Sequence, residues 1–231
     1  MVVLLLSYTG KVTNSSFNDE VSSTDNVLRV KGAPLFGEAD NFVVLAYSAV
    51  TNDGNSTITG DIGVSPLTSL AGFPPGVVNG TTNVADTAAA NAQIDLTIAC
   101  NTAAMWVPYI TETTLGGLNL LPGIYHSDGA LSLTGVLTLT GDANAVWIFQ
   151  AGSTLDTAAG SQIILIGGAK ADNVYWNVGS SATLGENSVF KGNIMAYASI
   201  TLNTGASLEG RALAQTAAVT LNDNTITKPS P

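Results

Sequence analysis

A short internal repeat restricts the fold of this chain more than any other feature of the sequence. The segment GNIMAYASITL at Gly192–Leu202 recurs as GRALAQTAAVTL at Gly210–Leu221, and a looser copy, NVYWNVGSSATL, occupies Asn173–Leu184. Two further copies lie upstream, at Ala145–Leu155 and Gly123–Leu133. Near the C-terminus the period is about 18 to 20 residues, which is typical of units that stack and bury a continuous core between them.

Within each copy the apolar residues alternate with polar or small ones. Val174, Trp176 and Val178 form one such series, and Ile200 and Leu202 end another. A period of two predicts strands, and corners rich in Gly and Asn separate them. Because the unit contains no helical pattern, the sequence predicts a mostly β, parallel β-helix (solenoid) of about six or seven coils. A β-sandwich would not repeat side-chain identity at a fixed period.

One alanine-rich segment, Ala85–Val107, breaks the repeat. It places Ile94, Ile98 and Met105 on one helical stripe and is followed by Pro108, a pattern that predicts one long helix. Its length of about 35 Å at 1.5 Å per residue is close to the about 29 to 34 Å of six or seven strands stacked about 4.8 Å apart. We therefore expect the helix to lie along the stack axis.

We expect the helix to cover an apolar stripe on the outside of the stack. Tyr175, Met195 and Leu213 recur at one outward point of the coil, where they would otherwise form an exposed apolar stripe. The segment Asn41–Pro66 has the pattern of another coil, placed before the helix, so we expect the solenoid to be interrupted.

The chain divides into an N-terminal extension, residues 1–34, and one solenoid domain, residues 35–231. We interpret the apolar segment Met1–Leu6 as the remnant of a secretory signal, because it lacks a basic region and is too short to span a membrane. Sequons at Asn14, Asn55 and Asn79 are compatible with a secretory route.

Charge is scarce and mostly negative. Among the 231 residues, Lys and Arg number 7 and Asp and Glu 17, and charged residues make up 10%, against about 25% in ordinary soluble domains. The formal net charge of −10 argues against nucleic acid and anionic membranes as partners, since both require clustered basic residues.

Groups suited to catalysis or metal binding are few. The single cysteine, Cys100, permits no internal disulfide and no cysteine-based zinc site, and we expect it to be buried. The chain has a single histidine, His126. A lone histidine is more often structural than catalytic. The acidic residues are spread at about one per coil, and no nucleophile elbow, phosphate loop or repeated calcium motif is present. We predict no enzyme activity, no metal and no cofactor.

Short, uncharged residues recur at the outward positions of the coils. The alternation of inward and outward residues predicts that Gln150, Gly152 and Thr154 lie below Gly179, Ser181 and Thr183 in the stack. The next coils contribute Tyr197, Ser199 and Thr201, and then Gln215, Ala217 and Thr220. The last coil carries one extra residue, which leaves its register open by one. Such a face is either a solvated β surface made of good strand formers or a regular binding surface.

Seven motifs in a fixed order resemble the microbial ice-binding (antifreeze) protein family. The resemblance extends from about Leu35 to Thr227. Its motifs are NFVVLA at Asn41–Ala46, ITGDIGVSP at Ile58–Pro66, LPGIY at Leu121–Tyr125, VWIFQ at Val146–Gln150, IGGA at Ile166–Ala169, NVYW at Asn173–Trp176 and GRALAQTA at Gly210–Ala217.

The resemblance implies an irregular right-handed β-solenoid with a long parallel helix. It also implies a secreted, extracellular protein that adsorbs to ice through one flat β face without a cofactor, gives thermal hysteresis and inhibits recrystallisation. We expect a monomer whose partner is the ice surface. Carried over by position, the ice-binding face includes Ser48 from the first coil, Thr216, and the recurring outward residues named above.

Two alternatives stay open. An adhesin-like or carbohydrate-binding solenoid would be expected to show an aromatic row or an acidic cleft, whereas Trp106 lies on the predicted helix, and Trp147 and Trp176 have core positions. A polysaccharide lyase would be expected to carry the Lys, Arg and calcium-ligand clusters that this sequence lacks.

Overall fold

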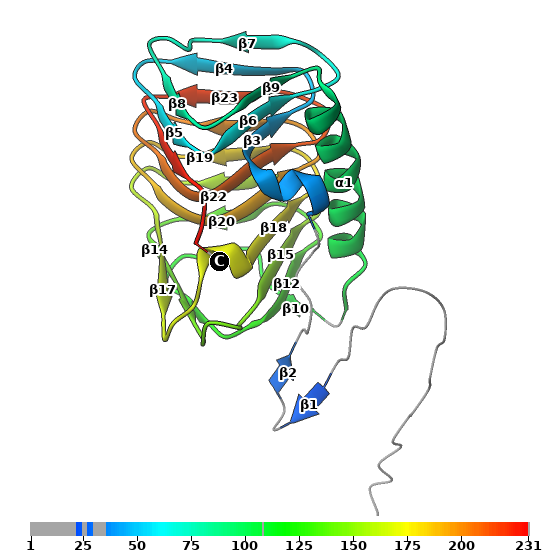
Figure 1. Cartoon of the computed structure of the whole chain (residues 1–231). Helices are drawn as coiled ribbons and strands as arrows, with labels where there is room; N and C mark the ends of the chain where they lie inside the picture. Colours follow the sequence, from blue (N-terminus) through cyan, green and yellow to red (C-terminus); the bar gives the residue numbers. More distant parts are fainter. Residues whose placement is uncertain (1–21, 25–26, 30–35, 108, 231) are drawn as a thin grey trace, which may run out of the picture.

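The repeat folds as a stack of β-strand coils with one helix along its side (Figure 1). The computed structural model describes residues 22–24, 27–29, 36–107 and 109–230. The apolar segment Met1–Leu6, the sequon at Asn14 and the predicted helix stop at Pro108 lie outside these residues. Before the stack, β1 (Ser22–Thr24) and β2 (Val27–Arg29) pair in antiparallel fashion.

Each coil contributes strands to three faces, and within the stack all the strand pairs recorded are parallel, as the repeat predicted. The helix-covered face consists of β10 (Ile110–Thr111), β12 (Gly123–Ser127), β15 (Trp147–Ala151), β18 (Val174–Val178), the C-terminal halves of β20 (Val189–Ala196) and β22 (Ser207–Ala214), β3 (Phe42–Ala46), β6 (Asp61–Val64) and β9 (Thr82–Val84).

The other two faces are bare of helix. The seven-stranded face consists of β13 (Leu131–Leu133), β16 (Leu155–Thr157), β19 (Ala182–Leu184), β21 (Ile200–Leu202), β23 (Val219–Asn222), β4 (Ala49–Asp53) and β7 (Ser69–Ala71). The third face consists of β11 (Asn119–Leu120), β14 (Val136–Thr140), β17 (Gln162–Ile166), the N-terminal halves of β20 and β22, β24 (Thr225–Thr227), β5 (Thr57–Thr59) and β8 (Val77–Asn79).

Strands β20 and β22 run through the corner between the third face and the helix-covered face. Gly192 and Gly210 lie in register at this bend, and Gly192 has a φ of 108°, a conformation that glycine adopts without strain. A Cβ atom at Gly210 would lie 1.9 Å from the carbonyl oxygen of Gly192. Glycine is therefore required where these two backbones approach each other.

The order of coils in the stack differs from their order in the chain. Strand β4 of the first coil pairs with β23 of the last coil, with Val50 opposite Val219. The helix α1 (Thr87–Ala104) then carries the chain along the stack to β10, at the far end of the helix-covered face (Figure 1). The predicted interruption of the solenoid is thus confirmed. The helix connects the coils that precede it in the chain to the opposite end of the stack.

The interior of the stack is apolar and contains a column of aromatic rings. Tyr125, Phe149, Trp176 and Phe190 follow one another, with ring centroids 5.3, 4.0 and 4.9 Å apart. Trp147 and Trp176 are buried in this core, as the sequence predicted. Aromatic stacking of this kind adds to the energy of apolar burial and connects successive coils.

Helix α1 covers the predicted residues. Tyr175, Met195 and Leu213 are buried in one cluster with the helix, which confirms that prediction. The helix begins after Asp86, whose side chain accepts a hydrogen bond from the backbone N–H of Ala89, so it is shorter than the expected 85–107.

The face of the helix that meets the sheet consists mostly of alanine. Its buried residues are Ala89, Ala92, Leu96, Ala99, Cys100 and Ala103. Ile94 and Ile98 are 61% and 53% exposed, so the stripe that they form with Met105 points to solvent. Small helix residues fit here because the sheet residues they meet are large, and packing requires complementary volumes.

Cys100 is buried, as expected, and burial raises the pKa of its thiol to about 12. The side chain therefore stays neutral and acts as a small apolar group. The described residues include no helix that is long and apolar enough to span a membrane.

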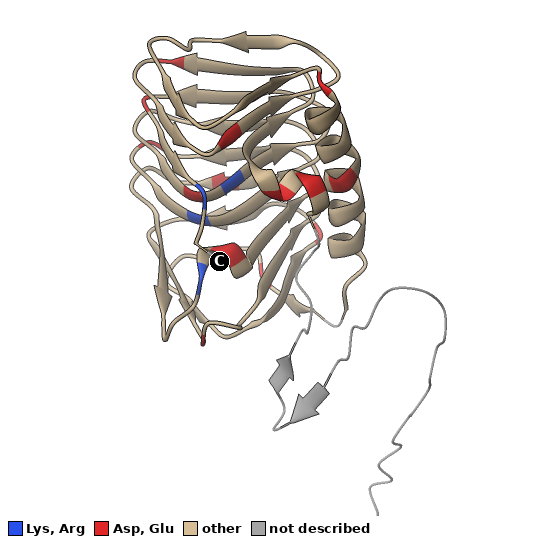
Figure 2. Ribbon diagram, in the orientation of Figure 1, with Lys and Arg blue, Asp and Glu red and all other residues tan. Residues whose placement is uncertain are grey.

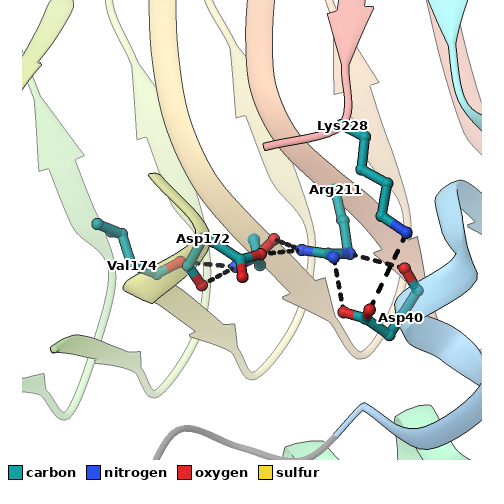
Figure 3. Close-up of polar contacts among 6 residues, drawn as sticks. Asp40, Asp172, Val174, Arg211 and Lys228 are labelled. Atoms are coloured by element: carbon teal, nitrogen blue, oxygen red, sulfur yellow. Dashed lines mark hydrogen bonds and ion pairs between the residues drawn. The ribbon is translucent and has the colours of Figure 1, made fainter. Parts of the chain in front are cut away.

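A buried arginine connects separate parts of the chain (Figure 3). Arg211 on β22 is 2% exposed. Its Nη1 donates to Asp172 Oδ1 and to Asn193 Oδ1, both at 2.7 Å, and its Nη2 donates to Asp40 Oδ1 at 2.6 Å. Lys228, beyond β24, lies 4.0 Å from Asp40.

The partners of Arg211 belong to three different segments. Asp40 lies in the 3₁₀ helix η1 (Gly37–Asn41), Asp172 in η2 (Ala171–Asn173) and Asn193 in β20. The guanidinium also lies 5.5 Å from the centroid of the Phe36 ring. Arg211 therefore connects η1, at the N-terminal side of the solenoid domain, to η2 and β20.

Replacing Arg211 with Met should lower the free energy of unfolding by about 3 kcal/mol, because the buried Asn193 and the partly exposed Asp172 and Asp40 all lose their donor. Lys191→Met is the matched control, since Lys191 forms a partly exposed ion pair with Glu209 that should contribute at most about 1 kcal/mol. Urea unfolding followed by circular dichroism measures both. Equal losses in the two variants would contradict the structural role of Arg211.

Candidate functional site

The outward side of the seven-stranded face carries a column of short side chains. We call this surface the threonine face. Each strand has one outward residue whose neighbours along the strand point into the core. The strand pairing places these outward residues opposite one another in successive coils. This first column runs, in stack order, through Ser132, Asp156, Thr183, Thr201, Thr220, Thr51 and Ala71.

A second column lies two residues before the first, at the first residue of β4 and β7 and directly before the first residue of the other strands. The backbone hydrogen bonds from Leu155 to Ser181, from Ala182 to Ser199 and from Ile200 to Ala218 fix its register. Its members, in the same order, are Thr154, Ser181, Ser199, Ala218, Ala49 and Ser69. The Ser181 and Ser199 hydroxyls lie 3.0 Å apart, and those of Thr51 and Thr220 lie 3.4 Å apart.

The two columns together form a regular two-dimensional array. Neighbouring strands of a sheet lie about 4.7 to 4.9 Å apart, and alternate residues of one strand lie about 6.6 to 6.8 Å apart. On β19, β21, β23, β4 and β7 the residues of both columns are Thr, Ser or Ala. Over five strands the array therefore offers methyl and hydroxyl groups without a charge.

Five of the predicted residues lie in the two columns in the register expected. They are Ser181, Thr183, Ser199, Thr201 and Thr220. Thr154 also lies in a column, but opposite Ser181 and not opposite Thr183. The predicted alignment of the coil that contains residues 150–154 is thus wrong by two residues. A slip of two preserves the inward and outward parity of a strand, so the pattern of apolar residues did not reveal it.

The predicted outward position of Gln150 on the flat face is wrong. Gln150 belongs to β15 of the helix-covered face and is 5% exposed. Its Nε2 donates to the carbonyl oxygens of Ala103 and Trp106, at 2.7 and 3.1 Å. These carbonyls lie at and just beyond the C-terminal end of α1, where helix carbonyls lack partners within the helix, so Gln150 satisfies them.

Four predicted residues lie at the corner between the threonine face and the helix-covered face. Tyr197 and Gln215 follow the ends of β20 and β22, and their backbone N–H groups donate to Val178 and Ala196. Gly152 and Gly179 occupy the same corner in the coils below, where a Cβ atom at Gly179 would lie 2.6 Å from the Gly152 carbonyl oxygen. This corner column is the margin of the array, and the exposed ring of Tyr197 is located there.

The extra residue of the last coil lies at this corner too. Ala214 pairs with Ala196, and Val219 pairs with Ile200, so Ala218 stands beside Ser199. The predicted place of Ala217 in the column is therefore wrong.

The remaining predicted residues also lie at this corner. The carbonyl oxygen of Ala217 accepts hydrogen bonds from the N–H groups of Tyr47 and Ser48, and the Thr216 hydroxyl donates to the Tyr197 carbonyl oxygen at 2.5 Å. Ser48, Thr216 and Ala217 thus lie beside the two columns and outside them.

Several members of the two columns were missed in the sequence. They are Ala49, Thr51, Ser69, Ala71, Ser132, Asp156 and Ala218. A signal existed for Thr51, because Ser48-Ala-Val-Thr51 resembles Ala217-Ala-Val-Thr220, and the structure pairs Thr51 with Thr220. The stacking of the first coil on the last could not be read from the order of the chain.

The third face has a smaller threonine array. Thr57 lies opposite Thr225, and Thr59 lies opposite Thr227. The next strands carry the ion pair between Lys191 and Glu209. Acidic and basic residues gather near η1, α1, β20 and β22 (Figure 2). The uncharged threonine array of the third face therefore ends after two strands.

The structure offers little support for catalysis. Across the described ranges, no group of three or more His, Cys, Asp or Glu side chains is placed to hold a metal ion. The His126 ring nitrogens lie 3.1 Å from Gln150 Oε1 and 3.0 Å from Asp128 Oδ1, and the ring packs 4.3 Å from that of Tyr109. These contacts hold the His126 ring against the neighbouring Gln150, Asp128 and Tyr109 side chains.

Comparison with known families and proteins gives a consistent result. Residues 44–227 match the sequence model of the family described as Ice-binding-like. A protein of Nostoc sp. (strain HG1) named Ice-binding protein is 48% identical over 210 residues, which are 89% of this chain and 78% of the relative. An Ice-binding protein of Flavobacterium frigoris (strain PS1) is 36% identical over 245 residues, covering 94% of this chain and 88% of the relative.

Solved structures agree with the fold. The crystal structure of an ice-binding protein from an Antarctic biological consortium superposes with a TM-score of 0.86 at 44% identity, covering 90% of this chain and 97% of the other. An ice-binding protein from the Antarctic ascomycete Antarctomyces psychrotrophicus gives a TM-score of 0.82 at 43% identity, covering 85% of this chain and 98% of the other.

Replacing Gln150 with Leu should lower the free energy of unfolding by about 1 to 3 kcal/mol, because the carbonyl groups at the end of α1 lose their donor while they stay buried. Gln162→Leu is the matched control, since Gln162 is an exposed residue of the third face, where a substitution should change stability by about 0.5 kcal/mol or less. Urea unfolding of both variants measures the difference. A Gln150→Leu variant as stable as its control would contradict the assigned role.

Proposed function

Since the chain belongs to the Ice-binding-like family, we propose that it binds ice through the threonine face. It thereby gives thermal hysteresis and inhibits ice recrystallisation. The observation that carries the proposal is the in-register array of Thr, Ser and Ala over β19, β21, β23, β4 and β7, which has no charged side chain in its two columns.

The chemistry of these side chains suits contact with solid water. Hydroxyl groups at fixed spacing donate and accept hydrogen bonds to surface water, and methyl groups between them hold water weakly. A water layer ordered in this way can join the lattice of ice at a low cost in immobilisation entropy. A strongly hydrated ammonium or carboxylate group would instead hold water in its own arrangement.

Rigidity supports the same function. The inward residues Ala182, Ile200, Val219 and Val50 behind the array are each at most 1% exposed, and parallel backbone hydrogen bonds join the strands. Because these groups are ordered before ice is bound, little conformational entropy is lost on adsorption. A flexible surface of the same composition would lose more.

The protein acts without catalysis, as a monomer and outside the cell. Exposure of the sequon residues Asn55 and Asn79 and the scarcity of basic residues support the secreted, ice-directed function. A carbohydrate-binding solenoid has less support, because Trp147 and Trp176 are buried in the core and cannot form an aromatic binding row.

Thr201 is the residue with which we test the proposed surface. Thr201→Tyr places a ring in the middle of the array and should lower thermal hysteresis about fivefold or more, because two surfaces separated by a ring lose their complementarity. Thr59→Tyr is the matched control, since it places the same ring on the third face. Nanolitre osmometry at equal protein concentrations measures hysteresis, and circular dichroism verifies folding.

The comparison separates the two faces. Hysteresis lost only in Thr59→Tyr would move the ice-contacting surface to the third face. Two folded variants with the hysteresis of the unsubstituted protein would overturn the proposal for the threonine face.

A further inference from the structure

One charged residue interrupts the first column of the threonine face. Asp156 on β16 lies between Ser132 on β13 and Thr183 on β19. Within the two columns as the structure describes them, every other member is Thr, Ser or Ala. The Asp156 side chain is exposed, so its carboxylate stands at the surface where the array would otherwise continue.

This carboxylate also changes the second column. The Thr154 hydroxyl donates a hydrogen bond to Asp156 Oδ2 at 2.6 Å. Thr154 is the member of the second column on the same coil, and its hydroxyl proton is directed to a neighbouring side chain instead of outward. One residue therefore alters both positions of this coil.

The array resumes on the far side of Asp156. Ser132 occupies the first column on β13, and Thr114 forms an isolated parallel bridge with it. Both side chains are short and uncharged. The threonine face thus consists of five uncharged strands on one side of Asp156 and a shorter uncharged part on the other.

Contact between ice and a carboxylate is unfavourable. Removing the hydration shell of an ionised carboxylate without giving it a partner costs far more than removing that of a hydroxyl group. Leaving the shell in place keeps ice away from the neighbouring side chains. Either way, adsorption is prevented at the coil that carries the charge.

We propose that Asp156 limits the ice-contacting area to the coils on the β19 side of it. The inference rests on the proposed function of the threonine face. It predicts that an uncharged residue at this position enlarges the contact area, and that Thr does so most, because it also releases the Thr154 hydroxyl and supplies a methyl group in register with Thr183.

The test compares Asp156→Thr, Asp156→Asn and Asp156→Ser with a matched control, Glu186→Gln. Glu186 is exposed in the turn that follows β19, so the control removes one negative charge outside the array. Thermal hysteresis is measured at equal protein concentrations, and thermal unfolding is followed for each variant. Asp156→Ser retains a small hydroxyl side chain in case Asp156→Thr does not fold.

Asp156→Thr should raise hysteresis about 1.4-fold, in proportion to the uninterrupted array, which grows from five strands to seven. Asp156→Ser should approach this value. Asp156→Asn should raise hysteresis less, because its amide oxygen still accepts from Thr154. Glu186→Gln should equal the unsubstituted protein.

Two results would overturn the inference. Folded Asp156→Thr and Asp156→Ser with unchanged or lower hysteresis would show that the charge does not limit contact, and an equal gain in Glu186→Gln would assign the effect to net charge. Failure of the proposed function is distinguishable, because the unsubstituted protein would then show no hysteresis. Failure of the assigned face would instead leave Thr201→Tyr with full hysteresis.

Discussion

The strand register between stacked coils is the constraint on which the rest of the structure depends. Parallel pairing aligns the inward residues of successive coils, as Ala182, Ile200, Val219 and Val50 show on one face. Because side chains alternate along a strand, the outward residues are aligned by the same bonds. Each column of the threonine face is therefore a consequence of the core packing behind it.

The helix makes this register possible for a chain that does not stack in sequence order. The first coil lies on the last, so the chain must travel along the stack between them. An alanine-rich helix face fits against the large side chains of Tyr175, Met195 and Leu213. Gln150 donates hydrogen bonds to the carbonyl groups at the end of this helix. Arg211 connects η1 and η2 to β20. The threonine face is left uncovered because the helix packs against another face of the stack.

Sequence periodicity was enough to predict the solenoid, the helix and the residues it covers. It was not enough for register, since a slip of two residues, as at Thr154, leaves the alternation unchanged. Parity also does not tell which of the three faces a strand belongs to, so Gln150 was assigned to the wrong face. Ala218 takes the column position because the last coil has one extra residue at its corner. The alanine side of α1 is the buried one because the sheet residues that it meets are large. Each of these details comes from contacts between coils, which no single repeat contains.

The most direct measurement of the central claim is solid-state NMR of the protein in frozen solution with labelled threonine methyl groups. Transfer of magnetisation from ice protons reports which methyl groups touch ice. The account predicts strong transfer to four threonines of the threonine face, Thr51, Thr183, Thr201 and Thr220. It predicts little transfer to four threonines of the third face, Thr57, Thr59, Thr225 and Thr227. Equal transfer to both sets, or stronger transfer to the third face, would contradict it.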